Sequence, residues 1–247
     1  MLRGLGYFIG FVVLTLLTQL GGFALLVALA FNRRVLVFVV AYTAISASTL
    51  FIAPMFGRVP LPCRGDGTLQ MQSYAFCALN RQYVVPELHD VLVTFATEMG
   101  QDFEGTKTRV LDANFPFLSG FPLLPHLSHH DGRKVDLAFY YEQDGRYLPG
   151  VARSLLGYFA FEQGVSTCPE VALTLRWDLD WLQPWWPDYR PDPQRMQVAL
   201  TRLANDARVA KVFIEPHLQR RFGVQSDKIR FQGCRAARHD DHIHIQL

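Results

Sequence analysis

The last ten residues of the chain, "RHDDHIHIQL", hold three histidines and two aspartates. His242 and His244 are separated by one residue and alternate with isoleucines, which is typical of a β-strand with one apolar and one polar face. Both imidazoles would then project from the same face, while the isoleucines anchor the strand in the core. Zinc binds histidine nitrogen and carboxylate oxygen, so this strand is a candidate contributor to a zinc site.

A second cluster of the same residue types lies upstream, in "PHLSHHDGRKVDLAFYY" over residues 125–141. Asp136 lies at the start of the clearest alternating strand pattern of the chain, and Gly132 provides a turn before it. His129 precedes Asp136 by seven residues, a separation over which the chain can fold back. A loop histidine and a strand aspartate can then meet a histidine of a neighbouring strand. The two clusters together predict zinc held by two histidines and one carboxylate, with water as the fourth ligand.

Alternatives to a metal site have weaker support in the sequence. A solvated tail would not need the isoleucines that alternate with the C-terminal histidines. Ser128 stands beside His129, but the chain has no G-x-S-x-G motif, no glycine-rich phosphate loop and no concentrated basic patch. Arg109 and Asp112 lie on an expected strand beside the site, and either could contact a substrate. Four further residues are expected to be in turns, packed or solvated: His89, His130, Asp131 and His217.

The two segments resemble the signatures of the penicillin-insensitive murein endopeptidases, which belong to a wider zinc peptidase superfamily with lysostaphin-type, D-Ala-D-Ala-cleaving and hedgehog-like members. The signature H-x-x-H-x6-D is met by His126, His129 and Asp136, and the signature H-x-x-H-x-H is met by His239, His242 and His244. The resemblance extends over the chain after residue 85 or so. The segment that is W-H-x-H in the relatives is "DHIH" here, and those relatives are typically soluble exported proteins.

The resemblance implies a role for each of the six residues. It implies that zinc is held by His129, Asp136 and His244, with an exchangeable water. It implies that His242 stabilises charge in the transition state, and that His239 is the general base. His126 would lie behind the ligands or on the substrate side. The implied substrates are amide bonds in peptidoglycan stem peptides or their cross-links.

The helices and strands that must position these residues are also indicated by the sequence. Their order predicts an α+β domain with a small, mainly antiparallel sheet and flanking helices. Three helices are expected, over residues 86–103, 193–207 and 216–222, each beginning at a proline. Four strands are expected, over residues 108–114, 135–141, 211–215 and 242–247.

Two uncharged, apolar runs precede this domain, Gly4 to Phe31 and Val35 to Gly57. A membrane-spanning helix needs about 20 apolar residues, so the runs predict two spans, with a hairpin at Arg33 and Arg34. We therefore divide the chain into a transmembrane hairpin, residues 1–60, and a zinc peptidase-like domain, residues 61–247. The alternative for the first run is a cleaved signal peptide, but the apolar region of a signal is only about 7–15 residues long.

Arginines and cysteines give the expected orientation. The positive-inside rule places Arg33 and Arg34 in the cytoplasm, although Arg3 would lie on the opposite flank. All four cysteines follow the apolar runs, as expected of an exported domain with two disulfides. Proximity favours Cys63–Cys77, which leaves Cys168–Cys234; four buried free thiols are the alternative. The expected location is the inner (cytoplasmic) membrane, with the domain facing the periplasm or exterior.

A proline-punctuated aromatic stretch, "RWDLDWLQPWWPDYRPDP" over residues 176–193, is expected to be mostly loop. We expect its tryptophans to pack within the domain; a substrate-binding wall or contact with the lipid interface are the alternatives.

These features lead to three functional hypotheses. The first is a membrane-anchored zinc metallopeptidase that hydrolyses peptidoglycan peptides. The second is a non-catalytic, zinc-containing scaffold of the cell envelope with the same fold, and the third is peptide hydrolysis unrelated to the wall. A net charge of +2 and scattered basic residues argue against a nucleic-acid partner, and protein partners in the envelope are not indicated by any motif.

Overall fold

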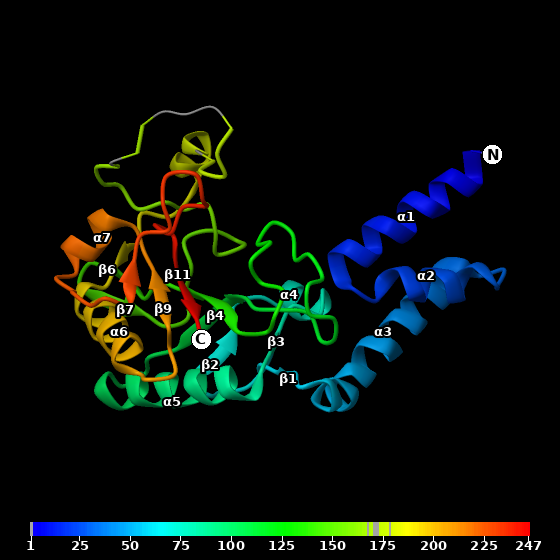
Figure 1. Cartoon of the computed structure of the whole chain (residues 1–247), viewed down its shortest axis with the longest axis horizontal. Coiled ribbons are helices and arrows are strands. Elements are labelled where there is room, and N and C mark those ends of the chain that lie inside the picture. The colour runs from blue at the N-terminus through cyan, green and yellow to red at the C-terminus, as the bar shows by residue number, and fades with distance from the viewer. Residues whose placement is uncertain (1, 167, 170–172, 178) are drawn as a thin grey trace.

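The computed structural model of the protein describes residues 2–166, 168–169, 173–177 and 179–247 (Figure 1). The helices are α1 (Leu2–Thr18), α2 (Gly21–Leu29), α3 (Arg34–Ile52), η1 (Ala53–Phe56), α4 (Tyr74–Ala78), α5 (Pro86–Asp102), η2 (Asp180–Trp185), α6 (Pro193–Asn205) and α7 (Pro216–Arg221). The strands are β1 (Val59–Pro60), β2 (Leu69–Met71), β3 (Tyr83–Val84), β4 (Thr108–Asp112), β5 (Lys134–Ala138), β6 (Tyr141–Gln143), β7 (Arg146–Leu148), β8 (Arg190–Pro191), β9 (Lys211–Phe213), β10 (Ile229–Arg230) and β11 (His242–Gln246).

A six-stranded sheet, ordered β10-β9-β11-β5-β4-β2, forms the centre of the globular part. The four middle strands pair antiparallel, whereas the outer pairs β10-β9 and β4-β2 are parallel. The expected mixture of helices and sheets is therefore confirmed, with a sheet that is mixed at its edges. The expected strand over 135–141 is interrupted after Ala138, and Tyr141 begins β6 of a separate three-stranded sheet.

The two faces of the sheet have different roles. Ile243 and Ile245 of β11 are fully buried and belong to one core cluster with Val135 and Leu137 of β5 and the buried residues of α5 and α6. Successive side chains of a strand point to opposite faces, so the residues between them face away from this core. The polar face of β5 and β11 is thus available for a site.

The expectation of two membrane-spanning helices is wrong. The first apolar run is broken at Gln19, whose φ of 65° ends α1, and the chain turns back into the nine-residue α2. Gly22 permits this close turn, because a Cβ there would lie 2.0 Å from Thr15 Oγ1. Among the described residues, one helix is long and apolar enough to cross a membrane, the 23 residues Arg34–Phe56.

This long helix is not the core helix of a soluble domain. Its apolar side chains are largely exposed, including Phe51 at 81% and Met55 at 84%. A helix of 23 residues is about 34 Å long, against a bilayer core of about 30 Å. A helix of this kind near the N-terminus is either a membrane span or a signal sequence.

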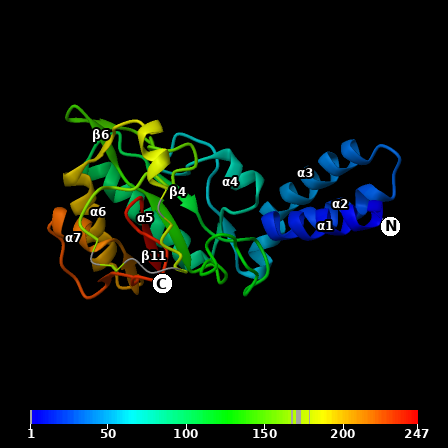
Figure 2. The same ribbon diagram turned by 90° about the horizontal axis from the view of Figure 1, so that it is seen from above.

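The turn at Gln19 also changes where the arginines lie. The N-terminus and the loop between α2 and α3 lie at the same end, away from the globular part, in both ribbon views (Figure 1, Figure 2). The guanidinium of Arg34 lies over the Tyr7 ring of α1, 5.4 Å from its centroid. Arg3, which we expected on the opposite flank, therefore shares this end with Arg33 and Arg34.

The helical unit α1–α3 is bonded to the globular part through the middle of α3 and through the turn after α1. Asn80, just after α4, donates to Tyr42 Oη at 3.1 Å and to Ser46 Oγ at 3.2 Å on α3. The Gln19 side-chain oxygen accepts a hydrogen bond of 3.1 Å from the backbone of Phe117. Two segments of the globular part, α4 and the loop 115–127, thus hold the helical unit.

The structure confirms both expected disulfides, Cys63–Cys77 and Cys168–Cys234, and its described residues include no free cysteine. The first ties the segment before β2 to α4. The second ties the loop region after β7 to the segment that leads into β11. Disulfides persist in oxidising compartments, so this pattern is typical of an extracytoplasmic domain.

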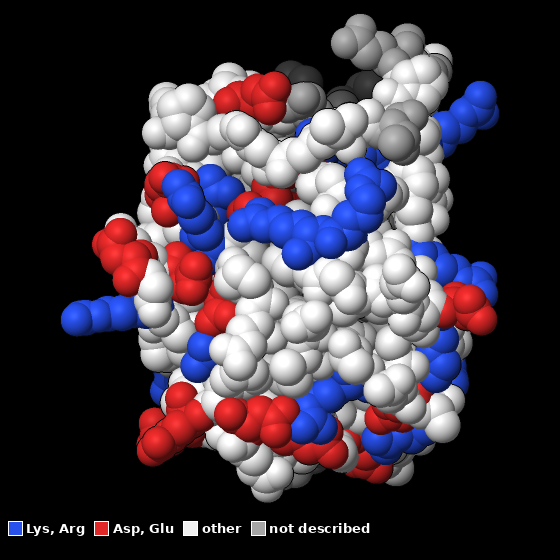
Figure 3. All heavy atoms as spheres, turned by 90° about the vertical axis from the view of Figure 1, so that its left-hand side faces the viewer, with Lys and Arg blue, Asp and Glu red and all other residues white. Residues whose placement is uncertain are grey.

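The aromatic stretch differs from its expectation. It contains η2 and β8, and Asp178 lies outside the described residues. The expected packing is wrong for three of the tryptophans, because Trp177, Trp181 and Trp185 are more than half exposed. Elsewhere, the face of the globular part turned away from the helical unit carries basic and acidic side chains around a broad uncharged area (Figure 3).

Candidate metal centre

The structure brings the two histidine clusters together on the polar face of β5 and β11. The antiparallel register places His244 directly opposite Asp136, and their Nδ1 and Oδ1 atoms are 2.7 Å apart. His129, on the loop before β5, places its Nε2 3.3 Å from the same Oδ1 and 3.2 Å from His244 Nδ1. The three donor atoms therefore converge on one buried point.

The spacing of these atoms suits zinc. In a tetrahedral site with bonds of about 2.0–2.1 Å, ligand atoms lie about 3.3 Å apart. His129 Nδ1 donates to the backbone oxygen of Ala113 at 2.8 Å, so in the neutral ring the Nε2 lone pair points at the site. Such a hydrogen bond behind the ligating nitrogen is the usual arrangement for a metal-binding histidine.

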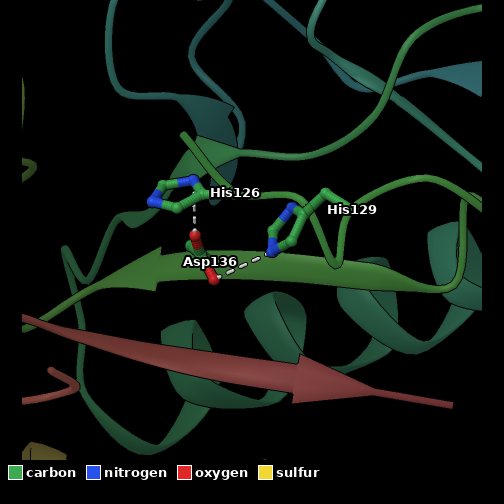
Figure 4. A group of neighbouring side chains, drawn as sticks. All are labelled: His126, His129 and Asp136. Atoms are coloured by element: carbon green, nitrogen blue, oxygen red, sulfur yellow. Dashed lines mark ion pairs between the residues drawn. The ribbon is translucent and has the colours of Figure 1, made fainter. Parts of the chain in front are cut away.

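His126 gives a second possible donor set. Donor atoms of His126, His129 and Asp136 all lie within 4.8 Å of one another and could hold a metal ion (Figure 4). However, His126 Nδ1 also lies 2.9 Å from Asp112, which in turn forms a buried ion pair with Arg81. That hydrogen bond keeps a proton on His126 Nδ1. His126 is therefore expected to lie beside the metal ligands and not to bind the metal itself.

His242 and His239 lie next to the converging donors. His242 Nε2 is 3.6 Å from Asp136 Oδ1, and its Nδ1 contacts the Asp241 carboxylate at 2.5 Å. The His239 ring packs against His242, with centroids 4.9 Å apart, and against Phe213 at 5.7 Å. All six residues expected in the site therefore belong to one cluster.

Burial and neighbouring charges give these histidines different pKa values. Burial opposes the charged form of His242, but the carboxylates of Asp136 and Asp241 outweigh it and raise its pKa to about 9. Burial lowers the pKa of His244 to about 4, partly offset by Asp136. Burial and the charges of His242 and His244 hold the pKa of His239 well below its usual range. At neutral pH His239 can accept a proton, while His242 carries one.

In the upstream cluster, His129 and Asp136 shift the pKa values of each other. Burial opposes the charged form of His129, yet the Asp136 carboxylate and its hydrogen bond raise the pKa of His129. Although burial raises the pKa of a carboxyl group, the surrounding histidines, His129 first, hold that of Asp136 well below its usual range. Asp136 is therefore ionised and ready to bind a cation.

Several contributing residues were only partly indicated by the sequence. Asp112, one of two residues that could contact a substrate, bonds His126 and lines the cavity described below, whereas Arg109 lies outside the cluster, bonded to Gln70 and the Met71 carbonyl. Tyr158, which no motif indicates, donates a 2.8 Å hydrogen bond to Asp136 Oδ2. Asp241 lies within the C-terminal motif. Its position directly before His242 was the sequence feature that could have indicated its contact with that ring. His130 lies in the turn before β5, where Asp131 bonds Lys134.

A cavity of about 290 Å³ opens beside this cluster. Four of its lining residues belong to the cluster or contact it: His126, His242, Asp112 and Tyr158. Its remaining walls come from α4, from the segment around Leu156 and Phe159, and from the segment around Trp177. A ligand in the cavity would therefore reach His126 and His242, which lie next to the converging donors.

Comparison of the chain with protein-family models and with curated proteins finds no match.

Proposed function

We propose that this protein is a membrane-anchored, zinc-dependent hydrolase of amide bonds. The observation that carries the proposal is the convergence of His129 Nε2, Asp136 Oδ1 and His244 Nδ1 within 2.7–3.3 Å beside an open cavity. Two histidines and a carboxylate are a common ligand set of catalytic zinc. Peptidoglycan stem peptides and their cross-links are the first substrates to test, because the signature spacing resembles that of murein endopeptidases.

The chain supplies the remaining groups that amide hydrolysis requires. Zinc held there would polarise the substrate carbonyl and lower the pKa of a water molecule to about 7. His239, neutral because of its depressed pKa, is placed to take a proton from the attacking water. His242 faces the cavity, and its ring N–H groups are placed to stabilise negative charge on the carbonyl oxygen. The C–N bond breaks, the water oxygen stays on the carbonyl carbon, and the amine leaves with a proton.

The same proposal places the hydrolase at the outer face of the inner membrane. Arg3, Arg33 and Arg34 at the far end of the helical unit favour that end in the cytoplasm, and both disulfides favour an oxidising compartment for the domain. Alkaline phosphatase fused after Leu247 should be active, and a cytoplasmic reporter fused there should be silent. The opposite result would contradict this location.

Cross-linked muropeptides and short linear peptides, incubated with the zinc-loaded full-length protein, test the reaction. We expect a mass change that identifies the bond cut, and none with the His129→Ala variant. Zinc binding without cleavage of any amide would instead support the non-catalytic scaffold. Cleavage of linear peptides alone would support hydrolysis unrelated to the wall.

A further inference from the structure

The cavity beside the metal centre is lined mainly by apolar side chains. They come from three segments that are distant in sequence: Phe76, Leu79, Leu156, Phe159, Leu175 and Trp177. The arginines on its wall are already engaged within the protein, since Arg81 pairs with Asp112 and Arg238 with Asp240. The wall therefore offers an apolar surface to a ligand, with hydrogen-bonding groups concentrated at the histidine end.

Three of these apolar side chains are also half open to solvent. Leu156, Leu175 and Trp177 are 52%, 58% and 55% exposed. Exposed apolar groups that gather around a cavity are typical of a binding site, because covering them is favourable.

The cavity is built on the same segments that hold the helical unit α1–α3. Phe76 and Leu79 belong to α4 and the residue after it, and the neighbouring Ala78 oxygen accepts a hydrogen bond from Tyr42 of α3. Pro125, another lining residue, belongs to the loop 115–127, whose Phe117 is bonded to Gln19 and packs against Phe56. Both lining segments are therefore in direct contact with the candidate membrane span Arg34–Phe56.

We propose that the cavity binds the acyl chain of a membrane-borne N-acyl amide, whose carbonyl then lies at the metal centre. This inference rests on the proposed hydrolase and names its substrate class. A volume of about 290 Å³ is at the small end of ligand cavities, which are about 300–1,000 Å³, so it suits one chain better than a folded peptide. Water attacks the acyl carbonyl, the C–N bond breaks, and the products are a long-chain acid and a free amine.

Adjacent leucines provide a matched pair of variants for the test. Leu156 lines the cavity, whereas Leu155 is 88% exposed and does not line it. Leu156→Glu would place a charge against the chain, and Leu155→Glu adds the same charge one residue away. Both side chains reach solvent, so both variants should fold.

The binding experiment uses the full-length protein in phosphatidylcholine vesicles and N-palmitoyl-glycine with a diazirine at the chain end. After illumination we expect label in the peptides that contain Phe76, Leu156 or Trp177. The label should persist in Leu155→Glu and in the metal-site variant His129→Ala, and fall at least tenfold in Leu156→Glu. Label confined to α1–α3, or equal in the two glutamate variants, would overturn the inference.

A rate experiment separates this inference from the proposed function. With zinc-loaded protein in the same vesicles, kcat/KM for N-acyl-glycines should rise about fourfold per added methylene and then level off. The increase of kcat/KM with chain length should be weaker in Leu156→Glu and unchanged in Leu155→Glu. Cleavage of peptides with no dependence on chain length would overturn the acyl proposal and leave the hydrolase standing. Labelling of the cavity without cleavage of any amide would overturn the hydrolase and leave the acyl site standing.

Discussion

The strand half and the loop half of the candidate metal centre are held in place by different forces. His244 lies on β11, which is hydrogen-bonded to β5 on one side and β9 on the other. Its neighbours Ile243 and Ile245 are fully buried on the opposite face. His126 and His129 lie on a loop, and their rings are oriented by side-chain contacts with Asp112 and the Ala113 carbonyl.

This difference indicates how each half should respond to change. The backbone ladder fixes the position of a strand ligand whatever its side chain, so a substitution there removes a donor and moves little else. Loop residues depend on individual hydrogen bonds, so their geometry is sensitive to partners such as Asp112. Changes to each half can therefore show whether metal is bound mainly by the strand or mainly by the loop.

The largest expected effect comes from removing the strand ligand. Structural zinc sites bind with about 10–16 kcal/mol, so one of four ligands is worth roughly 3 kcal/mol, or about 100-fold in affinity. We expect His244→Ala to weaken zinc binding by at least that factor. His126→Ala should weaken it by no more than about tenfold, as is usual for groups behind the ligands. Competition with a chelating dye measures both.

The reverse order of these two effects would assign the third ligand to His126. The metal would then be held by the donor set His126, His129 and Asp136, which is also sterically possible.

The second effect tests the frame of the strand half while all proposed ligands stay in place. Deletion of Ile245–Leu247 removes a fully buried isoleucine, the Gln246 side chain that is bonded to His244 Nε2, and the Leu247 backbone bond to Arg133. Each buried side chain contributes roughly 1.5–3 kcal/mol, so zinc affinity should fall about 10–100-fold. Calorimetric zinc titration of the full-length and shortened proteins checks this, with Leu247→Ala as the milder control. Equal affinities would show that β11 needs no C-terminal anchor.

The three helices α5, α6 and α7 and the four middle strands of the central sheet could be predicted because their signals are local. The alternation of isoleucine and histidine predicted β11, and prolines marked the first turns of α5, α6 and α7, whose observed ends differ little from the expected ones. The break in the first apolar run was missed because it depends on packing. Gly21 and Gly22 are a local signal for a break, but glycine is also frequent in membrane helices, and only the close contact of Gly22 with α1 shows why the chain turns there.

The part of the candidate site that could be predicted consists of the residues recognised by their type and spacing. All six named residues converge, because the alternating pattern of each strand places its polar residues on the same face and the loop before β5 is short. Tyr158 and Arg81 were not indicated, since they enter from segments whose positions are set by tertiary contacts. The apolar cavity was missed for the same reason, as its walls come from three separated segments.

A smaller effect, on pH dependence, distinguishes the two ligand histidines. Histidine must be neutral to bind zinc. The pKa of His244 is lowered to about 4, so it is already neutral at pH 6, whereas the raised pKa of His129 keeps that ring protonated there. Between pH 5 and 6, zinc affinity should therefore rise about tenfold per pH unit, one proton being released. A rise of about a hundredfold per unit would mean that both rings start protonated.

Bound zinc and the hydrolysis rate, measured together in the wild type and two variants, test the central claim most directly. The wild type should hold one zinc per chain. His129→Ala should hold none and be inactive, because a ligand is gone. His239→Ala should keep its zinc and lose rate by about 10²–10⁴-fold, the usual contribution of a general base. The account is contradicted if His239→Ala loses zinc as completely as His129→Ala, or if the wild type binds none.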